Sequence, residues 1–275
     1  MNIQEITKIL INNGIEENEA KYEIKMLLEH LFNYTEKDKL MGKTISNEDL
    51  KILQEKIEFR INTKTPIQYI IGKSWFMGEY FKVTPDVLIP RDETEILVKK
   101  AIEIINQNKF EDVLDIGTGS GCIACTIAKN TNATVLGIDI SSDALRIALD
   151  NVTNLRINNR AIFRKSNLFE KIREGESFDI IASNPPYIPY NTTLSEEVNK
   201  EPSIALYANE DGLEFYRKII EKAPEFLNKE GYLLFELGIN QAKFVSKFME
   251  KDFESIEVIK DLAGIDRVIV GKLKF

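Results

Sequence analysis

Apolar residues recur at helical spacing through residues 1–65. They form stripes on three successive segments, and each stripe repeats every three or four residues, as one face of an amphipathic helix does. Gly14 ends the first segment, and Ser46 with Asp49 forms a predicted capping box before the third. We therefore expect a small helical bundle that presents a surface to a substrate. The stripes are Ile3, Ile6 and Leu10; Ala20, Ile24, Leu27, Leu28 and Leu31; and Leu50, Leu53, Ile57 and Ile61.

The pattern changes between residues 66 and 90. This stretch, PIQYIIGKSWFMGEYFKVTPDVLIP, is rich in aromatic and β-branched residues, and Gly78 stands between two extended pieces. We interpret it as a β-hairpin that links two domains. The second domain, residues 91–275, is expected to begin with a helix that Asp92 and Glu95 cap.

Strand and helix patterns alternate in this second domain. Helical segments follow Gly121 and cover residues 142–155, a stretch from about 211, and 241–248. Only a loop separates the last two strands, so we expect one of them to run antiparallel. The pattern predicts an α/β fold with a doubly wound, mostly parallel seven-stranded sheet. The predicted strands are 112–117, 133–140, 161–167, 178–187, 231–238, 256–259 and 267–273.

Charge and rare residues exclude several function classes. The 36 basic and 44 acidic residues give a net charge of −8, which disfavours a general grip on nucleic acid phosphates but leaves a local basic groove open. His30 is the only histidine, so histidine triads and histidine-rich metal sites are excluded, and no metal is expected. No apolar run reaches the roughly 18 residues of a membrane span, and MNIQEITKILINNG lacks the regions of a signal peptide. We expect a cytoplasmic protein.

Cys122 and Cys125 form a C-x-x-C pattern at a predicted helix N-terminus. A redox dithiol is one interpretation, because a helix N-terminus lowers a thiol pKa. The other is that two small residues pack one helical face, and the preceding glycines account for the turn without redox chemistry. We favour packing and expect similar activity with the two thiols oxidised or reduced.

A glycine-rich turn follows the first predicted strand of the sheet. It contains Gly117, Thr118, Gly119, Ser120 and Gly121, and its glycines let a ligand approach the backbone.

Two acidic residues belong to the same predicted site, one just before this turn and one at the end of the next strand. Asp139 ends the next strand, where a carboxylate can accept from both ribose hydroxyls of an adenosine. The spacing G-x-G-x-G is not the dinucleotide pattern, and Asp115 before the first glycine would repel a pyrophosphate. The same carboxylate suits the cationic amino group of S-adenosylmethionine, so the sequence favours a methyl donor.

The segment Asn184-Pro185-Pro186-Tyr187 ends the fourth predicted strand. The prolines fix the backbone, so the Asn184 side-chain oxygen and the Pro185 carbonyl can both accept from one NH2 group. Tyr187 is expected to lie against the plane of the substrate. The alternative interpretation is a stiff turn after a strand, which the nearby adenosine site makes the weaker one.

Together these motifs resemble the bacterial peptide chain release factor N5-glutamine methyltransferases. The resemblance covers nearly the whole chain, and PRDETE with the aromatic hairpin is its most specific part. NPPY alone is shared with enzymes that methylate amino groups of DNA and RNA. The motifs are PIQYIIG (66–72), F-x-G-x-x-F-x-V (76–83), PRDETE (90–95), DIGTGSGCIA (115–124), SNPPYIP (183–189), EPSIAL (201–206), FELG (235–238) and DLAGIDRVI (261–269).

The resemblance implies a class I S-adenosylmethionine-dependent methyltransferase with an N-terminal helical domain that recognises the substrate. It would methylate N5 of the glutamine in the Gly-Gly-Gln motif of release factors and yield S-adenosylhomocysteine. By this likeness, Gly117 to Gly121 and Asp139 hold the donor, and Asn167 and Leu168 border the adenine. The family usually has Asp at the position of Asn167, so a neutral amide would meet the adenine amino group here. Release factors would be the partners of a monomer, with neither membrane nor direct nucleic acid contact.

The residues also suggest a mechanism that does not depend on the family resemblance. Asn184 and Pro185 would favour charge on a poorly nucleophilic amide nitrogen as it meets the sulfonium methyl, and no histidine base is needed.

Other functions also fit these residues. The main one is an N6-adenine or other nucleic-acid amino methyltransferase, because the same acceptor pair fits an exocyclic amino group. A non-catalytic binding protein and an NAD-dependent oxidoreductase are further ones. Residues Arg91 to Glu95 either cap a helix or line the donor site.

Overall fold

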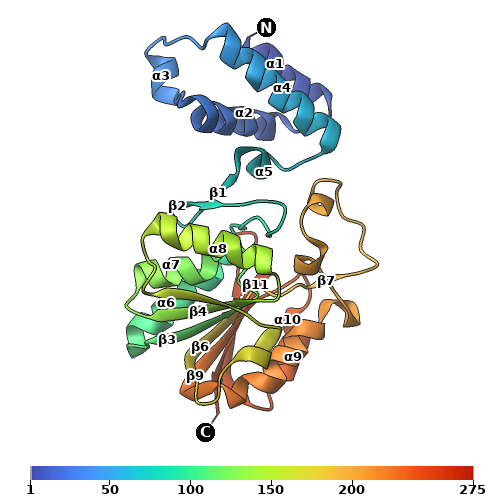
Figure 1. Ribbon diagram of the computed structural model, residues 1–275. Helices are drawn as coiled ribbons and strands as arrows, with labels where there is room; N and C mark the ends of the chain where they lie inside the picture. Colours follow the sequence, from blue (N-terminus) through green and yellow to red (C-terminus); the bar gives the residue numbers. More distant parts are fainter. Residues whose placement is uncertain (1, 275) are drawn as a thin grey trace. The chain divides into compact units, whose positions relative to one another are not determined.

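The computed structural model describes residues 2–274, and these form two compact units. The helical unit contains residues 2–73 together with Leu194–Lys200, and the sheet unit contains residues 74–193 and 201–274 (Figure 1). The segment Leu194–Lys200 follows Tyr187 closely along the chain and nevertheless belongs to the helical unit. No helix of residues 2–274 is long and apolar enough to cross a membrane.

Helices of the helical unit bury the predicted apolar stripes. Ile6 and Leu10 are fully buried against Leu27, Leu53 and Ile57, so one face of each long helix builds the core. The three predicted helices are confirmed. The helices are α1 (Ile3–Asn12), α2 (Glu17–Phe32), α3 (Glu36–Leu40), α4 (Asn47–Thr63) and α5 (Ile67–Ile71).

Two short helices of this unit depart from the sequence expectation. Residues 67–71, predicted to be extended, form α5 between Pro66 at its N-terminus and Gly72, whose φ of +79° ends it. The helix α3 was not predicted, although Thr35 and Asp38 form a capping box there. The Ser46 hydroxyl accepts from the backbone N–H of Asp49, as the predicted capping box requires. The Asp49 carboxylate, however, accepts from the Ser46 hydroxyl and not from the Ser46 backbone N–H.

The predicted hairpin consists of β1 (Lys73–Phe76) and β2 (Glu79–Lys82). Met77 and Gly78 both have positive φ, +50° and +85°, as the tight turn of a two-residue hairpin requires. Phe76 and Phe81 lie in the core of the sheet unit, whereas Trp75 and Tyr80 are about half exposed.

The sheet unit confirms the predicted α/β class. Its seven strands run in the order β10-β11-β9-β6-β3-β4-β5, and β11 is antiparallel to both neighbours. The central strands β9, β6, β3, β4 and β5 are parallel, as βαβ connections demand. The strands are β3 (Asp112–Ile116), β4 (Thr134–Asp139), β5 (Ala161–Lys165), β6 (Phe178–Ser183), β9 (Leu227–Glu236), β10 (Phe253–Lys260) and β11 (Asp266–Leu273).

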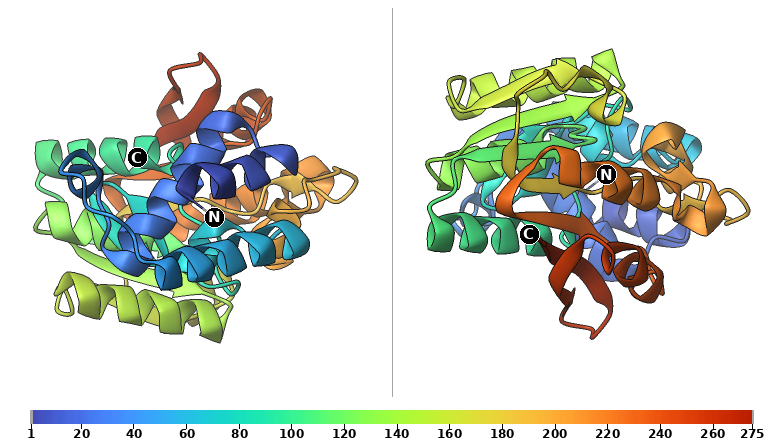
Figure 2. Two further views of the ribbon diagram at one scale, coloured as in Figure 1. Left: turned by 90° about the horizontal axis from the view of Figure 1, so that it is seen from above. Right: turned by 90° about the horizontal axis from the view of Figure 1, so that it is seen from below.

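Helices cover both faces of this sheet. One core contains Val113 with side chains of α6 (Thr94–Asn108), α7 (Cys122–Asn130) and α8 (Ser142–Leu155). The other contains Leu114 with side chains of α9 (Glu214–Lys222) and α10 (Ala242–Met249). Successive strand residues thus face opposite cores. Figure 2 shows the green helices α6 to α8 on one side of the sheet and the orange helices α9 and α10 on the other.

Short elements complete the sheet unit between its long strands. The small strands β7 (Ile188–Pro189) and β8 (Tyr207–Ala208) pair in parallel after the Asn184 segment. Single 3₁₀ turns of this unit occur at Leu168–Lys171, Ser203–Ala205, Glu210–Gly212 and Ala223–Glu225, and a further one, Val198–Lys200, belongs to the helical unit.

The predicted cap of the first long helix in the sheet unit is wrong. Glu93 precedes α6 in helical conformation, and no side chain caps the helix. The Glu95 carboxylate instead accepts from the Met77 amide at 2.9 Å and from Lys99 at 2.8 Å. The backbone amides of Thr94 and Glu95 already donate to the Arg91 and Asp92 carbonyls at the start of the helix, so the Glu95 side chain can bind the hairpin.

Candidate active site

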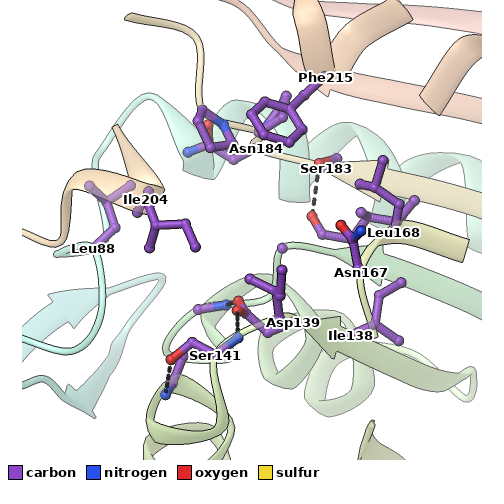
Figure 3. A pocket seen from close by; sticks show the side chains of 18 of the residues that line it. Leu88, Ile138, Asp139, Ser141, Asn167, Leu168, Ser183, Asn184, Ile204 and Phe215 are labelled. Carbon is purple, nitrogen blue, oxygen red and sulfur yellow. Dashed lines mark hydrogen bonds between the residues drawn. The ribbon is translucent and has the colours of Figure 1, made fainter. Parts of the chain in front are cut away.

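A pocket opens at the carboxyl ends of the parallel strands β3, β4 and β6. Figure 3 shows Asp139 and Ser141 on one side of it and Asn184 with Phe215 on the other. Ligand sites of open α/β sheets form at this edge, because the loops after the strands diverge there. The predicted donor residues and the predicted acceptor segment therefore meet in a single cavity of the sheet unit.

Glycines shape the first wall of the pocket. Gly117 and Gly119 line it and have φ of +73° and +55°, conformations that a side chain would strain. Gly121 has another reason to be glycine, because a Cβ there would lie 3.0 Å from Phe163 and 3.1 Å from the Ala148 side chain. The glycine turn thus exposes backbone to a ligand at one end and packs α7 closely at the other.

Asp139 lies at the end of β4 and lines the pocket. Each of its carboxylate oxygens accepts one backbone N–H, from Gly119 at 2.9 Å and from Ser141 at 2.8 Å. One further acceptor position per oxygen remains, which fits two ribose hydroxyls. Burial raises the pKa of Asp139, and these backbone hydrogen bonds oppose the rise.

Asp115 lies behind the residues that line the pocket, and its expected role toward the donor amino group stays a prediction. Its carboxylate is fully buried, accepts from the Thr118 hydroxyl at 2.6 Å and from the Ala124 amide at 3.2 Å, and does not line the pocket. Its Oδ1 has no hydrogen-bond partner, and burial raises the pKa of Asp115 to about 7. The Oδ2 of Asp115 is directed at the N-terminus of α7, where amides and the helix dipole favour a carboxylate, and its Oδ1 remains without a partner.

Thr118, Ser120 and Gly121 also do not line the pocket, and their expected contact with the donor stays a prediction. Thr118 and Ser120 are buried, with 3% and 2% of their surfaces exposed. The spacing of a turn identifies which residues are near a ligand, but the backbone conformation decides which of them point away.

Asn167 and Leu168 line the pocket as expected from the family resemblance. Leu168 has φ of +47°, unusual for a branched side chain, and its carbonyl accepts from the Ser166 hydroxyl at 2.6 Å. The Asn167 NH2 donates to Glu170 at 2.7 Å, which leaves the amide oxygen as the acceptor for a ligand amino group.

The acceptor segment forms the opposite wall. Asn184, Pro185 and Pro186 line the pocket directly after β6, and Ser183 fastens the strand by donating to the Ile116 carbonyl at 2.8 Å. The Asn184 NH2 donates to the Thr94 hydroxyl at 3.3 Å. The stiff turn and the binding segment are thus one feature, because the prolines hold Asn184 at the pocket.

Tyr187 does not line this pocket, and its expected position against the substrate plane stays a prediction. Its hydroxyl donates to Glu236 at 3.3 Å, and its carbonyl accepts from the Gln241 amide at 2.9 Å. Burial and the Glu236 carboxylate raise the pKa of Tyr187. A Cβ on Gly212 would approach the Tyr187 carbonyl oxygen to 2.1 Å, so glycine is required there.

Apolar side chains complete the pocket. Leu88, Ile204 and Phe215 come from separate segments of the sheet unit and lie around the cavity (Figure 3). Two of these segments are joined by buried Glu201, which accepts from the Ile89 amide at 3.0 Å and pairs with Arg91. Arg91 therefore neither caps α6 nor lines the pocket, and it secures the EPSIAL segment.

The cysteine pair belongs to the core. Cys122 and Cys125 are free, buried thiols on α7, and burial raises the pKa of Cys122 to about 12 and that of Cys125 further. A thiol that stays protonated at neutral pH is a poor nucleophile, which supports the packing interpretation.

Glu236 was not predicted as a site residue, and Thr94 was considered only as part of the segment Arg91 to Glu95, as a capping or donor-lining residue. Both are buried, with 2% of their surfaces exposed, and they bond to each other and to Asn184 and Tyr187. Their signal was present in the PRDETE and FELG motifs, but neither composition nor spacing indicates that these two motifs meet.

The fold and the pocket define a class I S-adenosylmethionine-dependent methyltransferase. The donor fits on the observations above, with glycine backbone, an acidic residue with free acceptor positions and an apolar floor at one sheet edge. A methyltransferase domain family matches residues 94–268.

Curated relatives narrow the class. A release factor glutamine methyltransferase of Fusobacterium nucleatum is 41% identical over 84% of this chain and 67% of its own length. Those of Clostridium acetobutylicum and Thermodesulfovibrio yellowstonii are 44% and 42% identical, over 76% and 82% of this chain and 75% and 82% of theirs. The chain belongs to the release factor glutamine methyltransferase family, which confirms the resemblance inferred from the motifs, and it is an S-adenosylmethionine-dependent protein-glutamine methyltransferase.

Solved structures of more distant proteins share the fold. A methyltransferase from Pyrococcus furiosus has a TM-score of 0.54 at 18% identity, covering 80% of this chain and 96% of that chain. A Thermus thermophilus 16S rRNA methyltransferase in complex with AdoMet and guanosine has a TM-score of 0.54 at 16% identity, covering 74% of this chain and 50% of that chain. At these identities the likeness supports the fold alone.

Proposed function

We propose that this enzyme methylates the N5 side-chain nitrogen of the glutamine in the Gly-Gly-Gln motif of peptide chain release factors. The observation that carries the proposal is the position of Asn184 and Pro185, which line the same pocket as the donor residue Asp139. The names of the relatives add the substrate class. Acceptor groups for one NH2 beside a donor site are what transfer to a primary amide requires.

The proposed chemistry starts from a poor nucleophile. The lone pair of an amide nitrogen is delocalised into its carbonyl, so the nitrogen gains reactivity only when its charge and orientation are controlled. Asn184 Oδ1 and the Pro185 carbonyl accept from its two hydrogens and bind a developing positive nitrogen more strongly than a neutral one. Bound S-adenosylmethionine supplies an electrophilic methyl group on a sulfonium.

The proposed methyl transfer does not require a base from the protein. The glutamine nitrogen forms a bond to the methyl carbon as the bond between that carbon and sulfur breaks. The N-methylated amide then loses one proton to water, because a protonated amide nitrogen is strongly acidic. The side chains that line the pocket bind and orient, and none of them needs to take up the proton.

We also propose that the helical domain, residues 1–65, recognises the release factor, and that the enzyme acts as a monomer on a protein and not on nucleic acid. The net charge of −8 supports a partner that carries basic patches. The core of the helical unit leaves Tyr22, Leu40 and Met41 exposed, which offers apolar contacts to such a partner.

A competition experiment tests the proposed function. The enzyme is incubated with labelled S-adenosylmethionine and an equimolar mixture of purified release factor, tRNA and duplex DNA, and the methylated atom is mapped by mass spectrometry. We expect label only on the glutamine of Gly-Gly-Gln. A release factor with that glutamine changed to glutamate is the matched control and should remain unlabelled. Label on an adenine amino group would instead identify a nucleic-acid methyltransferase.

A further inference from the structure

Glu236 is a buried carboxylate at the end of β9 that does not line the donor pocket. Its Oε2 accepts from the Thr94 hydroxyl, and its Oε1 accepts from the Tyr187 hydroxyl at 3.3 Å. Buried carboxylates usually pair with a cation. Here both hydrogen-bond partners are hydroxyl groups, so the carboxylate determines where two hydroxyl hydrogens point.

The donor and acceptor inventory fixes the direction of each hydrogen bond in this cluster. An ionised carboxylate can only accept, and a threonine hydroxyl has one hydrogen to donate. The hydrogen of Thr94 is therefore directed at Glu236. The contact of 3.3 Å between the Thr94 oxygen and the Asn184 side chain must then use Thr94 as acceptor, so Asn184 presents its NH2 to Thr94.

We propose that Glu236 and Thr94 are positioning residues for Asn184, because they hold its NH2 on Thr94 and leave its Oδ1 as the acceptor for the substrate amide. The inference rests on the proposed function, in which Asn184 accepts from the glutamine NH2. Rotation of the Asn184 amide by half a turn would place NH2 against NH2. That arrangement loses the substrate hydrogen bond and opposes the charge that develops on nitrogen.

The same carboxylate holds the other end of the acceptor segment. Tyr187 donates to Glu236, and Gln241 donates to the Tyr187 carbonyl at 2.9 Å. Asn184 and Tyr187 are the first and last residues of Asn-Pro-Pro-Tyr, and the two prolines between them have no backbone N–H with which to be anchored. The single buried carboxylate thus connects both ends of a segment that cannot hold itself through its backbone.

The ionisation of Glu236 controls this arrangement, because a protonated carboxyl could donate to Thr94 and free the Thr94 hydrogen for Asn184. Burial raises the pKa of Glu236 to about 7, and the bonds from Thr94 and Tyr187 oppose the rise. Glu93 and Arg267 are the charged groups facing it, paired with each other at 3.3 Å. Tyr187, Tyr216 and Cys122 also face it, and their pKa values are all raised, so they stay protonated at neutral pH.

The test compares matched threonine variants of the full chain, assayed on release factor. Thr94→Val removes the hydroxyl and keeps the shape, and Thr94→Ser restores the hydroxyl. We expect Thr94→Val to lower kcat about 10-fold, the effect of one hydrogen bond of roughly 1.4 kcal/mol, with KM and donor affinity unchanged. Thr94→Ser should recover most of the loss. Thr131→Val is the control, because that buried hydroxyl also donates and accepts one hydrogen bond but lies at the far end of α7.

A second variant supplies a readout that a merely structural role would not change. In the wild-type enzyme, kcat should fall as pH decreases through about 7, where Glu236 takes up a proton. Asp115 takes up a proton in the same range, so the assignment requires Glu236→Gln. The amide of that variant can donate to Thr94 at every pH, and we expect a lower kcat, about 10-fold at pH 8, without the acidic limb. An acidic limb in Glu236→Gln with the same midpoint and depth as in the wild type overturns the role of Glu236, whereas a smaller remaining limb belongs to Asp115.

Nuclear magnetic resonance of the free enzyme separates this inference from the proposed function. The side-chain NH2 signal of Asn184, assigned by its loss in Asn184→Ala, should exchange more slowly in the wild type and in Thr94→Ser than in Thr94→Val. Equal exchange in all three, or equal kcat for Thr94→Val and Thr94→Ser, overturns the positioning role. A wild-type enzyme that leaves release factor unmethylated overturns the proposed function instead, and the exchange rates still decide the positioning of Asn184.

Discussion

Glu23 of the helical unit and Glu236 of the sheet unit are both buried, and their surroundings are opposite. In the helical unit, Glu23 accepts from Arg60 at 3.0 Å and 3.2 Å, and Arg60 also pairs with Glu197 at 2.7 Å. In the sheet unit, Glu236 accepts from two hydroxyls. Burial raises the pKa of both carboxyls, but Arg60 opposes the rise for Glu23.

This difference implies that Glu23 stabilises its unit, whereas Glu236 positions catalytic side chains. An arginine compensates buried charge and joins Glu197, from the segment Leu194–Lys200, to α2 and α4. The hydroxyls beside Glu236 compensate a buried charge less well than an arginine does. Their hydrogens can reorient, however, so the ionisation of Glu236 determines through Thr94 how Asn184 is held. Changes around Glu23 should therefore affect stability, and changes around Glu236 should affect catalysis and its pH dependence.

The largest effect is expected from removing the cation of the helical unit. Arg60→Met leaves Glu23 buried without a counter-charge and should lower the free energy of unfolding of that unit by about 3 to 5 kcal/mol. Hydrogen exchange of the α2 and α4 amides, followed in urea, measures it. The double variant Glu23→Leu/Arg60→Met should recover most of the loss, because no buried charge remains. A loss below about 1 kcal/mol in the single variant would contradict the comparison.

Removing the end point of the Glu236 network should affect the rate and not the fold. Asn184→Ala is expected to lower kcat by about 100- to 1000-fold, the usual effect of deleting a group that stabilises transition-state charge. Donor affinity, measured by calorimetry, and the free energy of unfolding should remain near wild type. Asn108→Ala is the control, since that amide donates only to the Ile104 carbonyl within α6. Full turnover by Asn184→Ala would exclude Asn184 from the reaction.

Glu236 should also make stability depend on pH. Its pKa in the folded enzyme, about 7, exceeds the ordinary value of 4.5, so its contribution is fully present below pH 4.5 and is lost as pH rises to 7. The wild type should therefore lose about 3 kcal/mol relative to Glu236→Gln across that interval. Urea unfolding of both proteins at several pH values measures the difference, in which the titration of Asp115 cancels. A difference that is constant with pH would be incompatible with this assignment.

Asp139 is expected to affect the donor alone. Asp139→Asn removes the charge from bonds to ribose hydroxyls worth roughly 1.5 to 3 kcal/mol, so donor affinity should fall about 10- to 100-fold. Saturating donor should restore much of kcat, which distinguishes this loss from that of Asn184→Ala. Asp143→Asn removes the same charge from the same helix entry without touching the pocket and should bind donor normally.

The smallest effect concerns the surface of the helical unit. Leu40 is 87% exposed, and Leu40→Glu should raise KM for intact release factor about 3- to 10-fold while leaving a short glutamine peptide unaffected. Leu149→Glu, at a half-exposed position of α8, is the control. An unchanged KM in Leu40→Glu and in the corresponding variants of Tyr22 and Met41 would place recognition elsewhere.

Periodicity by itself determined most of the fold. The pattern of 142–155 predicts α8 to the residue, and alternating strands and helices predict a parallel sheet with one antiparallel insertion. Local signals are sufficient here, because burial of one helix face or of both strand faces imposes a periodic pattern of apolar residues on neighbouring positions. The same logic failed at Pro66–Gly72, where β-branched and aromatic residues suggested a strand but a proline and a left-handed glycine formed a turn of helix.

The pocket was also predicted in outline, since Gly117, Asp139 and Asn184 each end or directly follow a strand, and parallel strands end at one edge. Only the tertiary structure decided which way individual side chains point. The Oδ2 of Asp115 accepts from α7, the Tyr187 hydroxyl donates to Glu236, and Thr94 meets Glu236 across 142 residues of sequence. Hydrogen-bond direction depends on partners brought together by sheet order and helix packing, and a linear pattern carries no information about partners that are distant in the chain.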